Sequence, residues 1–185
     1  MSDSAALGQR MAARLAAVRE HVRCENAHDL GAIVQTFGES AGYEDAAWDE
    51  HYAGLDEVRS YYEGLLRSVP DLLIDVRHEY VTPEHVILEV AIRGTHRGTW
   101  RGLPATGRTV AIPLCAVFTF DAQDCLTGER VYYDRATVLK QLGVFHEPET
   151  FAGRLATIVA HPLTIARIAA GGIVRSLARL ISRRS

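Results

Sequence analysis

The chain has 185 residues, of which 48% are apolar and 23% are charged, for a formal net charge of −3. This length and composition fit one globular domain with an appended segment, and they exclude disordered and fibrous classes. The charge is unevenly divided: residues 1–147 hold 14 basic and 22 acidic side chains (−8), whereas residues 148–185 hold 6 and 1 (+5). We therefore expect two segments of different character, residues 1–147 and 148–185.

The sequence also argues against several protein classes. Cys24, Cys115 and Cys125 form no CxxC pair, so a reducing cytoplasm is expected rather than a disulfide framework or a zinc site. The N-terminus has no continuous apolar core typical of a secretory signal, and no run of eighteen apolar residues predicts a spanning helix. Nucleotide-binding, triad and metal-binding motifs are absent, so we expect no cofactor, no metal and no nucleic acid.

The spacing of apolar residues predicts helices first and strands afterwards. Apolar positions recur every three or four residues over 4–24, 29–37 and 56–69, which is typical of amphipathic helices. After Pro70 the period changes to two, and it predicts strands near residues 72–76, 86–92, 110–120 and 127–136. The order indicates an α+β fold in which a curved antiparallel sheet packs on N-terminal helices.

Strand periodicity suggests where ionisable side chains lie. His96 shares a strand face with Val90 and Ile92, which is the expected core face. On the last strand Arg130, Tyr132 and Asp134 share one face, opposite Glu129, Val131 and Tyr133. Periodicity alone does not decide which of these two faces points inward. A carboxyl group in an apolar enclosure has a raised pKa, which suits general acid/base chemistry.

Four pieces of sequence resemble one family in the same order. They are Asn26–Leu30, the segment from Gly54 to Leu72, the glycine-rich stretch Gly94–Arg108, and Glu129 to Asp134 followed by Gln141–Gly143. Over residues 15–145 the chain resembles the SnoaL-like polyketide cyclases of the nuclear-transport-factor-2-like superfamily. The resemblance implies a cone-shaped α+β barrel (cystatin-like) with one deep apolar pocket, followed here by a C-terminal helical extension.

The resemblance also implies a reaction. Aspartate at the position of Asp134 acts as general acid/base in the cyclases, with a histidine at the position of His96 nearby, and a ring closes by intramolecular aldol condensation without metal or cofactor. On this basis Asp134→Asn is expected to abolish turnover. Arg130 is a departure, because the family commonly has an aromatic residue there. It would lower the pKa of Asp134 or hold a substrate carboxylate, with Tyr132 positioning the substrate.

Several aromatic residues are candidates for substrate binding. The resemblance implies that Trp48 and Tyr43 lie at the mouth of the cone, and Trp100 follows His96 along the chain. They would stack on a flat polycyclic ligand, or they would fill the wide end of the cone or a dimer contact.

Other functions stay open at this stage. The superfamily also includes isomerases, epoxide hydrolases and binding proteins, so a pocket protein without chemistry is the main alternative. That alternative predicts a closed Arg130–Asp134 ion pair in a narrow pocket. The expected partners are a hydrophobic small molecule and a second copy of the chain. The basic, apolar segment 150–185 would pack on residues 1–147 of its own chain or of a second copy in a dimer, or it would lie on an anionic membrane surface.

Overall fold

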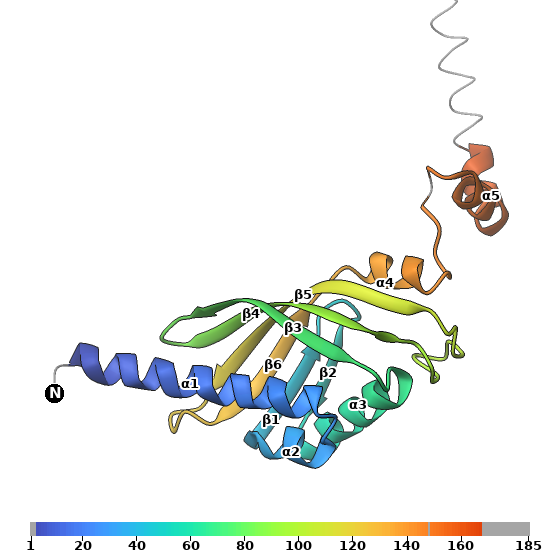
Figure 1. Ribbon diagram of the computed structural model, residues 1–185. Helices are drawn as coiled ribbons and strands as arrows, with labels where there is room; N and C mark the ends of the chain where they lie inside the picture. The colour runs from blue at the N-terminus through green and yellow to red at the C-terminus, as the bar shows by residue number, and fades with distance from the viewer. Residues whose placement is uncertain (1–2, 148, 168–185) are drawn as a thin grey trace, which may run out of the picture. The chain divides into compact units, whose positions relative to one another are not determined.

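A computed structural model describes residues 3–147 and 149–167 (Figure 1). The chain divides into two compact units, residues 1–142 and residues 143–185. The division falls a few residues before the boundary expected at residue 147. The two units are described separately below, and the first contains every candidate site residue.

The three predicted N-terminal helices are confirmed. They are α1 (Asp3–Asn26), α2 (Leu30–Gln35) and α3 (Leu55–Ser68). Asp29 starts α2 as its N-cap, since its side chain accepts a hydrogen bond from the backbone N–H of Ala32 at 3.0 Å. Helix α3 ends just before Pro70, whose ring is incompatible with a continuing helix.

Six strands form one sheet in the order β2-β1-β6-β5-β4-β3. The strands are β1 (Phe37–Asp45), β2 (Glu50–Ala53), β3 (Leu73–Val81), β4 (His85–Thr95), β5 (Thr109–Phe120) and β6 (Leu126–Tyr132). All neighbours are antiparallel except β1 and β6, which are parallel. The predicted α+β fold with a curved sheet is confirmed, but the sheet is mixed rather than antiparallel throughout. Charged residues and glycines obscure the alternation in β1, and the β1–β2 hairpin before α3 was not predicted.

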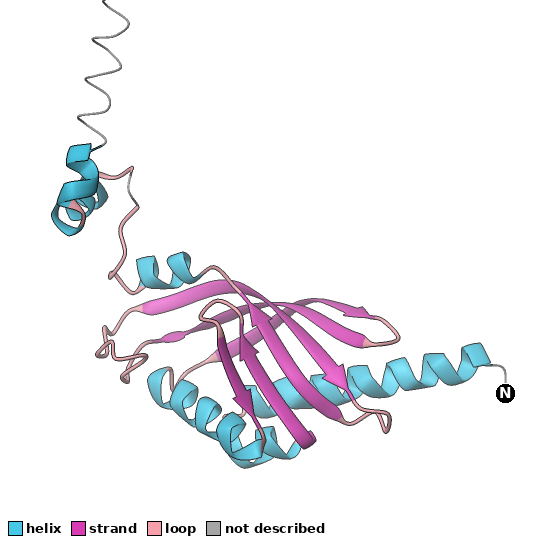
Figure 2. Ribbon diagram, turned by 180° about the vertical axis from the view of Figure 1, so that it is seen from behind, coloured by secondary structure: helices cyan, strands magenta, loops and turns pink. Residues whose placement is uncertain are grey.

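The α1, α2 and α3 helices lie against one face of the curved sheet (Figures 1 and 2). The main core between these layers includes Val18, Val58, Tyr62, Leu88 and Phe118, each at most 1% exposed. Burial of each such side chain contributes about 1.5–3 kcal/mol. The site described below lies within this same interior.

A short helix that was not predicted, α4 (Arg135–Gln141), follows β6 directly. Residues expected to continue the last strand instead leave the sheet after Tyr132, and Asp134 becomes the N-cap of α4. Val138 and Leu142 pack against Val110 and Ile112 of β5 in a second small core cluster. The α4 helix therefore adds apolar residues at one end of the sheet.

The second unit contains α5 (Phe151–Ala160), which starts at Thr150 as N-cap. Its large apolar side chains Phe151, Leu155 and Val159 are exposed within the described chain. The rest of the predicted basic extension, residues 168–185, lies outside the described residues. Among the helices that the structure describes, none is long and apolar enough to cross a membrane.

Candidate functional site

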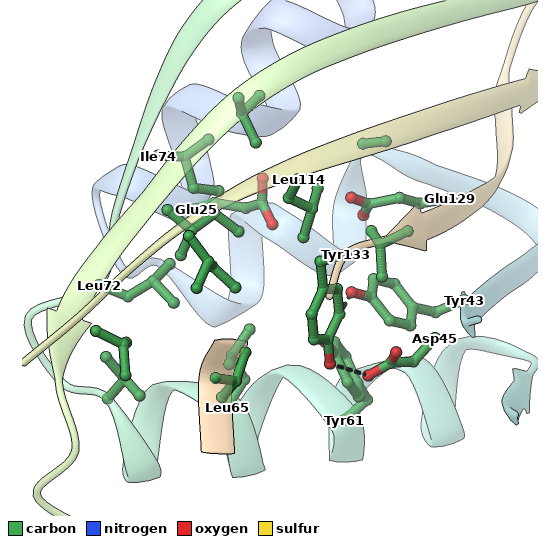
Figure 3. A pocket seen from close by; sticks show the side chains of 18 of the residues that line it. Glu25, Tyr43, Asp45, Tyr61, Leu65, Leu72, Ile74, Leu114, Glu129 and Tyr133 are labelled. Carbon is green, nitrogen blue, oxygen red and sulfur yellow. Dashed lines mark hydrogen bonds between the residues drawn. The ribbon is translucent and has the colours of Figure 1, made fainter. Parts of the chain in front are cut away.

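A cavity of about 110 Å³ lies in the interior of the first unit. Its lining is mostly aliphatic, and it comes from both layers: Leu65 belongs to α3, and Leu88 and Leu114 belong to neighbouring strands of the sheet. Figure 3 shows the carboxyl groups of Glu25 and Glu129 among these side chains. The cavity combines an apolar surface with a few polar groups, as small-molecule sites do.

Glu25 and Glu129 belong to a buried cluster of ionisable side chains. His21 is fully buried, and its Nε2 lies 3.8 Å from Glu25 Oε2 and 3.4 Å from Glu129 Oε2. The Tyr62 hydroxyl donates a hydrogen bond to Glu129 at 2.6 Å. Three elements, α1, α3 and β6, thus bring one imidazole, one phenol and two carboxyl groups together.

The environment of Glu25 alters its acidity. Burial raises the pKa of Glu25 to about 8, because the ionised form is poorly solvated inside the protein. His21 opposes this shift, whereas the neighbouring carboxylate of Glu129 adds to it. Burial by itself would lower the pKa of His21, but Glu25 and Glu129 outweigh that effect and raise it. Glu25 can therefore exchange a proton near neutral pH.

His96 presents a second polar group to the cavity. Its side chain is 1% exposed, and its Nδ1 accepts a hydrogen bond from the backbone N–H of Thr106 at 3.2 Å. Because a backbone amide only donates, Nδ1 carries no proton and Nε2 carries one in the neutral ring. Nε2 has no hydrogen-bond partner in the described chain. His96 therefore offers an unpaired N–H donor to a bound molecule.

A glycine places His96 at this position. The backbone N–H groups of Arg97 and Gly98 both donate to the carbonyl oxygen of Ser68, at 2.9 and 3.0 Å. A Cβ at Gly98 would lie only 2.3 Å from the carbonyl oxygen of Arg67. A side chain at this position would push the loop away from the end of α3.

The third polar group is Asp45, at the end of β1. The Tyr133 hydroxyl donates to its carboxylate at 2.8 Å, and the Arg101 guanidinium contacts the same oxygen at 2.9 Å. Burial raises the pKa of Asp45, although the bonds from Tyr133 and Arg101 oppose the shift. Asp45 is thus paired with an arginine, whereas the charged partner of Glu25 is His21.

Aromatic side chains surround Arg101. Its guanidinium lies 4.6 Å from the centre of the Trp48 ring and 5.2 Å from that of Trp100. Tyr61, Leu65, Trp100 and Arg101 line both the cavity and an adjoining surface groove. We therefore take the gap between α3 and the loop that carries Trp100 as the entrance to the cavity.

Comparison with known proteins is consistent with this geometry. The family model described as SnoaL-like polyketide cyclase matches residues 15–142, which include all the cavity-lining residues named above. The chain belongs to the SnoaL-like polyketide cyclase family. No curated protein is significantly similar to it.

Solved structures show the same fold. AclR of Streptomyces galilaeus, for which a hydroxylase activity has been suggested, is 24% identical with a TM-score of 0.64, over 74% of this chain and 99% of its own. A protein of Jannaschia sp. CCS1 assigned to the SnoaL-like polyketide cyclases is 16% identical with a TM-score of 0.67, over 74% and 95%. SalBIII, an epoxide hydrolase/cyclase-like enzyme of pyran ring formation in salinomycin, is 24% identical with a TM-score of 0.57, over 66% and 91%. At these identities the likeness establishes the fold alone.

In this member of the SnoaL-like family, Asp134 does not lie in the cavity. It is exposed and caps α4, accepting hydrogen bonds from the backbone N–H groups of Ala136 and Thr137 at 2.9 and 3.1 Å. The Thr137 hydroxyl and these N–H groups lower the pKa of Asp134, which is the opposite of the expected shift. The prediction that Asp134 faces the pocket is wrong, because the chain leaves the sheet before it.

The other outward residues of β6 are corrected in the same way. Arg130 is exposed and forms an ion pair with Glu44, and Tyr132 is 45% exposed. Neither lines the cavity, so their expected roles in positioning a substrate have no support in this geometry. The closed Arg130–Asp134 pair that a non-catalytic protein would need is not among the described ion pairs either.

The remaining predicted residues lie in or next to the cavity. His96, Tyr43 and Trp100 line it. Trp48 does not line it, but its ring packs against Trp100 with centroids 5.3 Å apart. Tyr43 is buried and accepts a hydrogen bond from the Tyr61 hydroxyl at 2.7 Å. Their roles in substrate binding remain predictions.

The sequence interpretation did not identify Glu25, Glu129 or Asp45. A signal for Glu25 was present, since His21 and Glu25 follow Val18 and Val22 on the apolar stripe of α1. Ionisable residues on an apolar stripe are buried, and buried ionisable residues are candidates for function.

Proposed function

We propose that this protein is an acid/base enzyme that acts without a cofactor on a hydrophobic carbonyl compound, as a cyclase or an isomerase. The observation that carries the proposal is the carboxyl group of Glu25, which is buried in an apolar cavity, and burial raises its pKa to about 8. A carboxyl group with a pKa near the working pH both accepts and donates protons effectively. The family and the apolar lining support a hydrophobic substrate.

The cavity contains groups for both halves of an enolisation. Ionised Glu25 removes a proton from the carbon next to a carbonyl group, and the electron pair moves toward the carbonyl oxygen. The free Nε2–H of His96 donates a hydrogen bond to that oxygen and stabilises its developing charge. In a cyclase the resulting enolate carbon then attacks a second carbonyl carbon of the same molecule.

Proton exchange in D₂O tests the proposal without knowledge of the natural substrate. The purified protein is incubated with a panel of hydrophobic cyclic ketones, and deuterium incorporation next to the carbonyl is followed by NMR. We expect catalysed exchange whose rate rises with pH through about 8, as Glu25 ionises. Glu25→Gln should reduce the rate about 10²–10⁴-fold, the usual contribution of a general base.

Asp134→Asn is the matched control for this experiment. It also converts a carboxylate to an amide, but outside the cavity, and it should exchange like the wild type. If Glu25→Gln exchanges as fast as the wild type, Glu25 is not the base. If no ketone exchanges with the wild-type protein, the proposal of enolisation chemistry fails.

A binding protein without chemistry is the second candidate. It is favoured by the cavity volume of about 110 Å³, which is below the roughly 300–1,000 Å³ of pockets for drug-sized ligands. This candidate predicts that ketones from the panel bind, as measured by calorimetry, but do not exchange. An epoxide panel followed for hydrolysis distinguishes a third reaction on the same fold.

A further inference from the structure

A continuous chain of hydrogen bonds lies behind the cavity carboxylates. His21 Nδ1 lies 2.6 Å from the Thr36 hydroxyl, and His21 Nε2 lies 3.0 Å from the Tyr62 hydroxyl. The Tyr62 hydroxyl lies 2.6 Å from Glu129 Oε2. Only Glu129 of these four residues lines the cavity, so the chain leads from the protein interior to the site.

Thr36 fixes the direction of the first bond. Its hydroxyl has a single hydrogen, which it donates to the carbonyl oxygen of Ile33 at 2.6 Å. The threonine oxygen can then only accept from the imidazole. With this orientation of the hydroxyl group, His21 Nδ1 carries a proton.

Tyr62 also has a single hydrogen, and besides a contact with Glu25 it contacts both His21 Nε2 and Glu129 Oε2. If it donates to ionised Glu129, it must accept from a protonated His21 Nε2, and the ring is an imidazolium. If instead it donates to a bare His21 Nε2, it must accept from a protonated Glu129. If Nε2 carried no proton while Glu129 was ionised, one of the two contacts of Tyr62, to His21 or to Glu129, would contain no hydrogen. Each permitted arrangement contains one shared proton.

We propose that His21, Tyr62 and Glu129 form a proton store that supplies Glu129 as the general acid of the site. In the loaded state, Nε2–H of His21 donates to Tyr62. The proton passes to the tyrosine oxygen while the tyrosine hydrogen passes to Glu129, so the phenol gains one proton and loses one. Glu129 then presents a carboxylic acid to the cavity.

This inference rests on the proposed function and completes its proton balance. In an aldol closure Glu25 takes the α-proton, a carbon–carbon bond forms, and the oxygen of the attacked carbonyl receives the proton from Glu129. Glu25 ends with one extra proton and the store lacks one. Glu25 Oε2 lies 3.8 Å from the same His21 Nε2, so the proton can return without a further reactant.

The surroundings of His21 favour retention of this proton. The titratable groups that face it are Glu25 on its own helix, Tyr62 on α3 and Glu129 on β6. The β1 and β5 strands contribute only the rings of Phe37 and Phe118, with centroids 5.1 and 5.9 Å from the imidazole. Burial and the two carboxylates raise the pKa of Tyr62, so the phenol stays neutral while it passes the proton on.

NMR of the resting protein tests the store independently of activity. Imidazole ¹⁵N and glutamate ¹³C shifts are followed from pH 5 to 10, and His21 and Glu129 are assigned from the signals that the His21→Gln and Glu129→Gln variants lose. At pH 7.5 we expect a protonated Nδ1, together with a proton on either Nε2 or Glu129. A bare Nε2 beside an ionised Glu129 at that pH would overturn the proposal, as would an unprotonated Nδ1.

The Glu129→Gln variant also tests the coupling within the store. It removes one of the two carboxylates that raise the pKa of His21, so His21 Nε2 should lose its proton at a lower pH than in the wild type. Glu44→Gln, on the outside of the sheet beside Arg130, is the matched control and should leave the His21 signals unchanged. An Nε2 proton that is lost at the same pH in Glu129→Gln and in the wild type contradicts the proposed store.

The pH profile of ketone exchange separates this inference from the proposed function. Glu129→Gln removes a negative charge that raises the pKa of Glu25, so the midpoint of exchange should move to lower pH. An unmoved midpoint counts against coupling between the store and the base. Absence of exchange in the wild-type protein refutes the enolisation chemistry, while the NMR result on the store still stands.

Discussion

The two faces of β6 carry polar residues in alternation, but only one face belongs to the site. Glu129, together with Tyr133 just beyond the end of the strand, points inward and lines the cavity, whereas Arg130 and Tyr132 point outward and are exposed. The inward carboxylate is held by Tyr62, and the outward arginine is held by Glu44 at the surface. Neighbouring residues on one strand thus differ in function because the sheet separates their surroundings.

Carboxyl groups in the two regions show the same contrast. Burial raises the pKa of Glu25 to about 8, whereas hydrogen bonds from Thr137 and Ala136 lower the pKa of exposed Asp134. One group is able to exchange protons near neutral pH, and the other is a helix cap that is ionised at neutral pH. The predictions below test whether this contrast governs the behaviour of the protein.

Among the changes considered below, the largest effect is expected from the unpaired Nε2–H donor of His96 inside the cavity. His96→Asn keeps an oxygen able to accept from the backbone N–H of Thr106 but removes the Nε2–H group. Loss of one donor to a developing oxyanion typically lowers turnover by roughly 10²–10³-fold. Ketone exchange should fall by this amount while the melting temperature changes little. Unchanged exchange would show that the His96 ring does not contact the reacting oxygen.

The pH dependence of stability should reveal the inward carboxyl group. The pKa of Glu25 is raised from 4.5 to about 8 on folding, so between these values unfolding releases its proton. The contribution of Glu25 to the free energy of unfolding is then fully present below about pH 4.5. It declines as the pH rises toward 8, by at most about 1.4 kcal/mol per pH unit. The raised pKa of His21 acts in the same direction. Urea denaturation from pH 5 to 8.5 should show the decline, and Glu25→Gln should show a weaker one.

The paired carboxylate Asp45 should depend on its arginine. Arg101→Ala removes a partner 2.9 Å from a carboxylate that is 1% exposed, and we expect a loss of about 1–3 kcal/mol in unfolding free energy at pH 7. In the Asp45→Asn background, removal of Arg101 should cost less because no buried charge is stranded. Equal costs in both backgrounds would show that the pair is not coupled.

The smallest effect is expected at Asp134, the exposed N-cap of α4. Asp134→Asn keeps a residue that is favourable at a helix N-cap, so the melting temperature should change only slightly. Ketone exchange should equal that of the wild type. A large loss of exchange would restore the role that family resemblance implied for Asp134.

Sequence periodicity predicted much of the fold and part of the site. Four strands and three helices were visible because their apolar residues alternate or recur regularly, and His96 was placed correctly by the parity of β4. The β1–β2 hairpin was missed because charged residues and glycines interrupt its pattern. Its inward carboxylate, Asp45, was missed with it.

The Asp134 interpretation failed for a local reason. Strand parity left both faces of β6 open, and the family motif favoured the wrong one. The structure shows that Asp134 does not face the cavity, because the chain enters α4 at this point. Asp134 is the N-cap of that helix and accepts a hydrogen bond from the backbone N–H of Thr137. Sequence motifs identify such a segment, but they do not show where a strand stops.

The parallel pairing of β1 with β6 has a consequence for how the protein folds. Phe37 in β1 pairs with Leu126 in β6, so this pairing joins segments that lie far apart along the chain. Contacts of such long sequence separation slow folding. Asp45 and Glu129 lie on these two strands, so we expect them to reach their places when the strands pair. We therefore expect the polar interior to appear in one final kinetic phase, after the β3–β4 hairpin has formed.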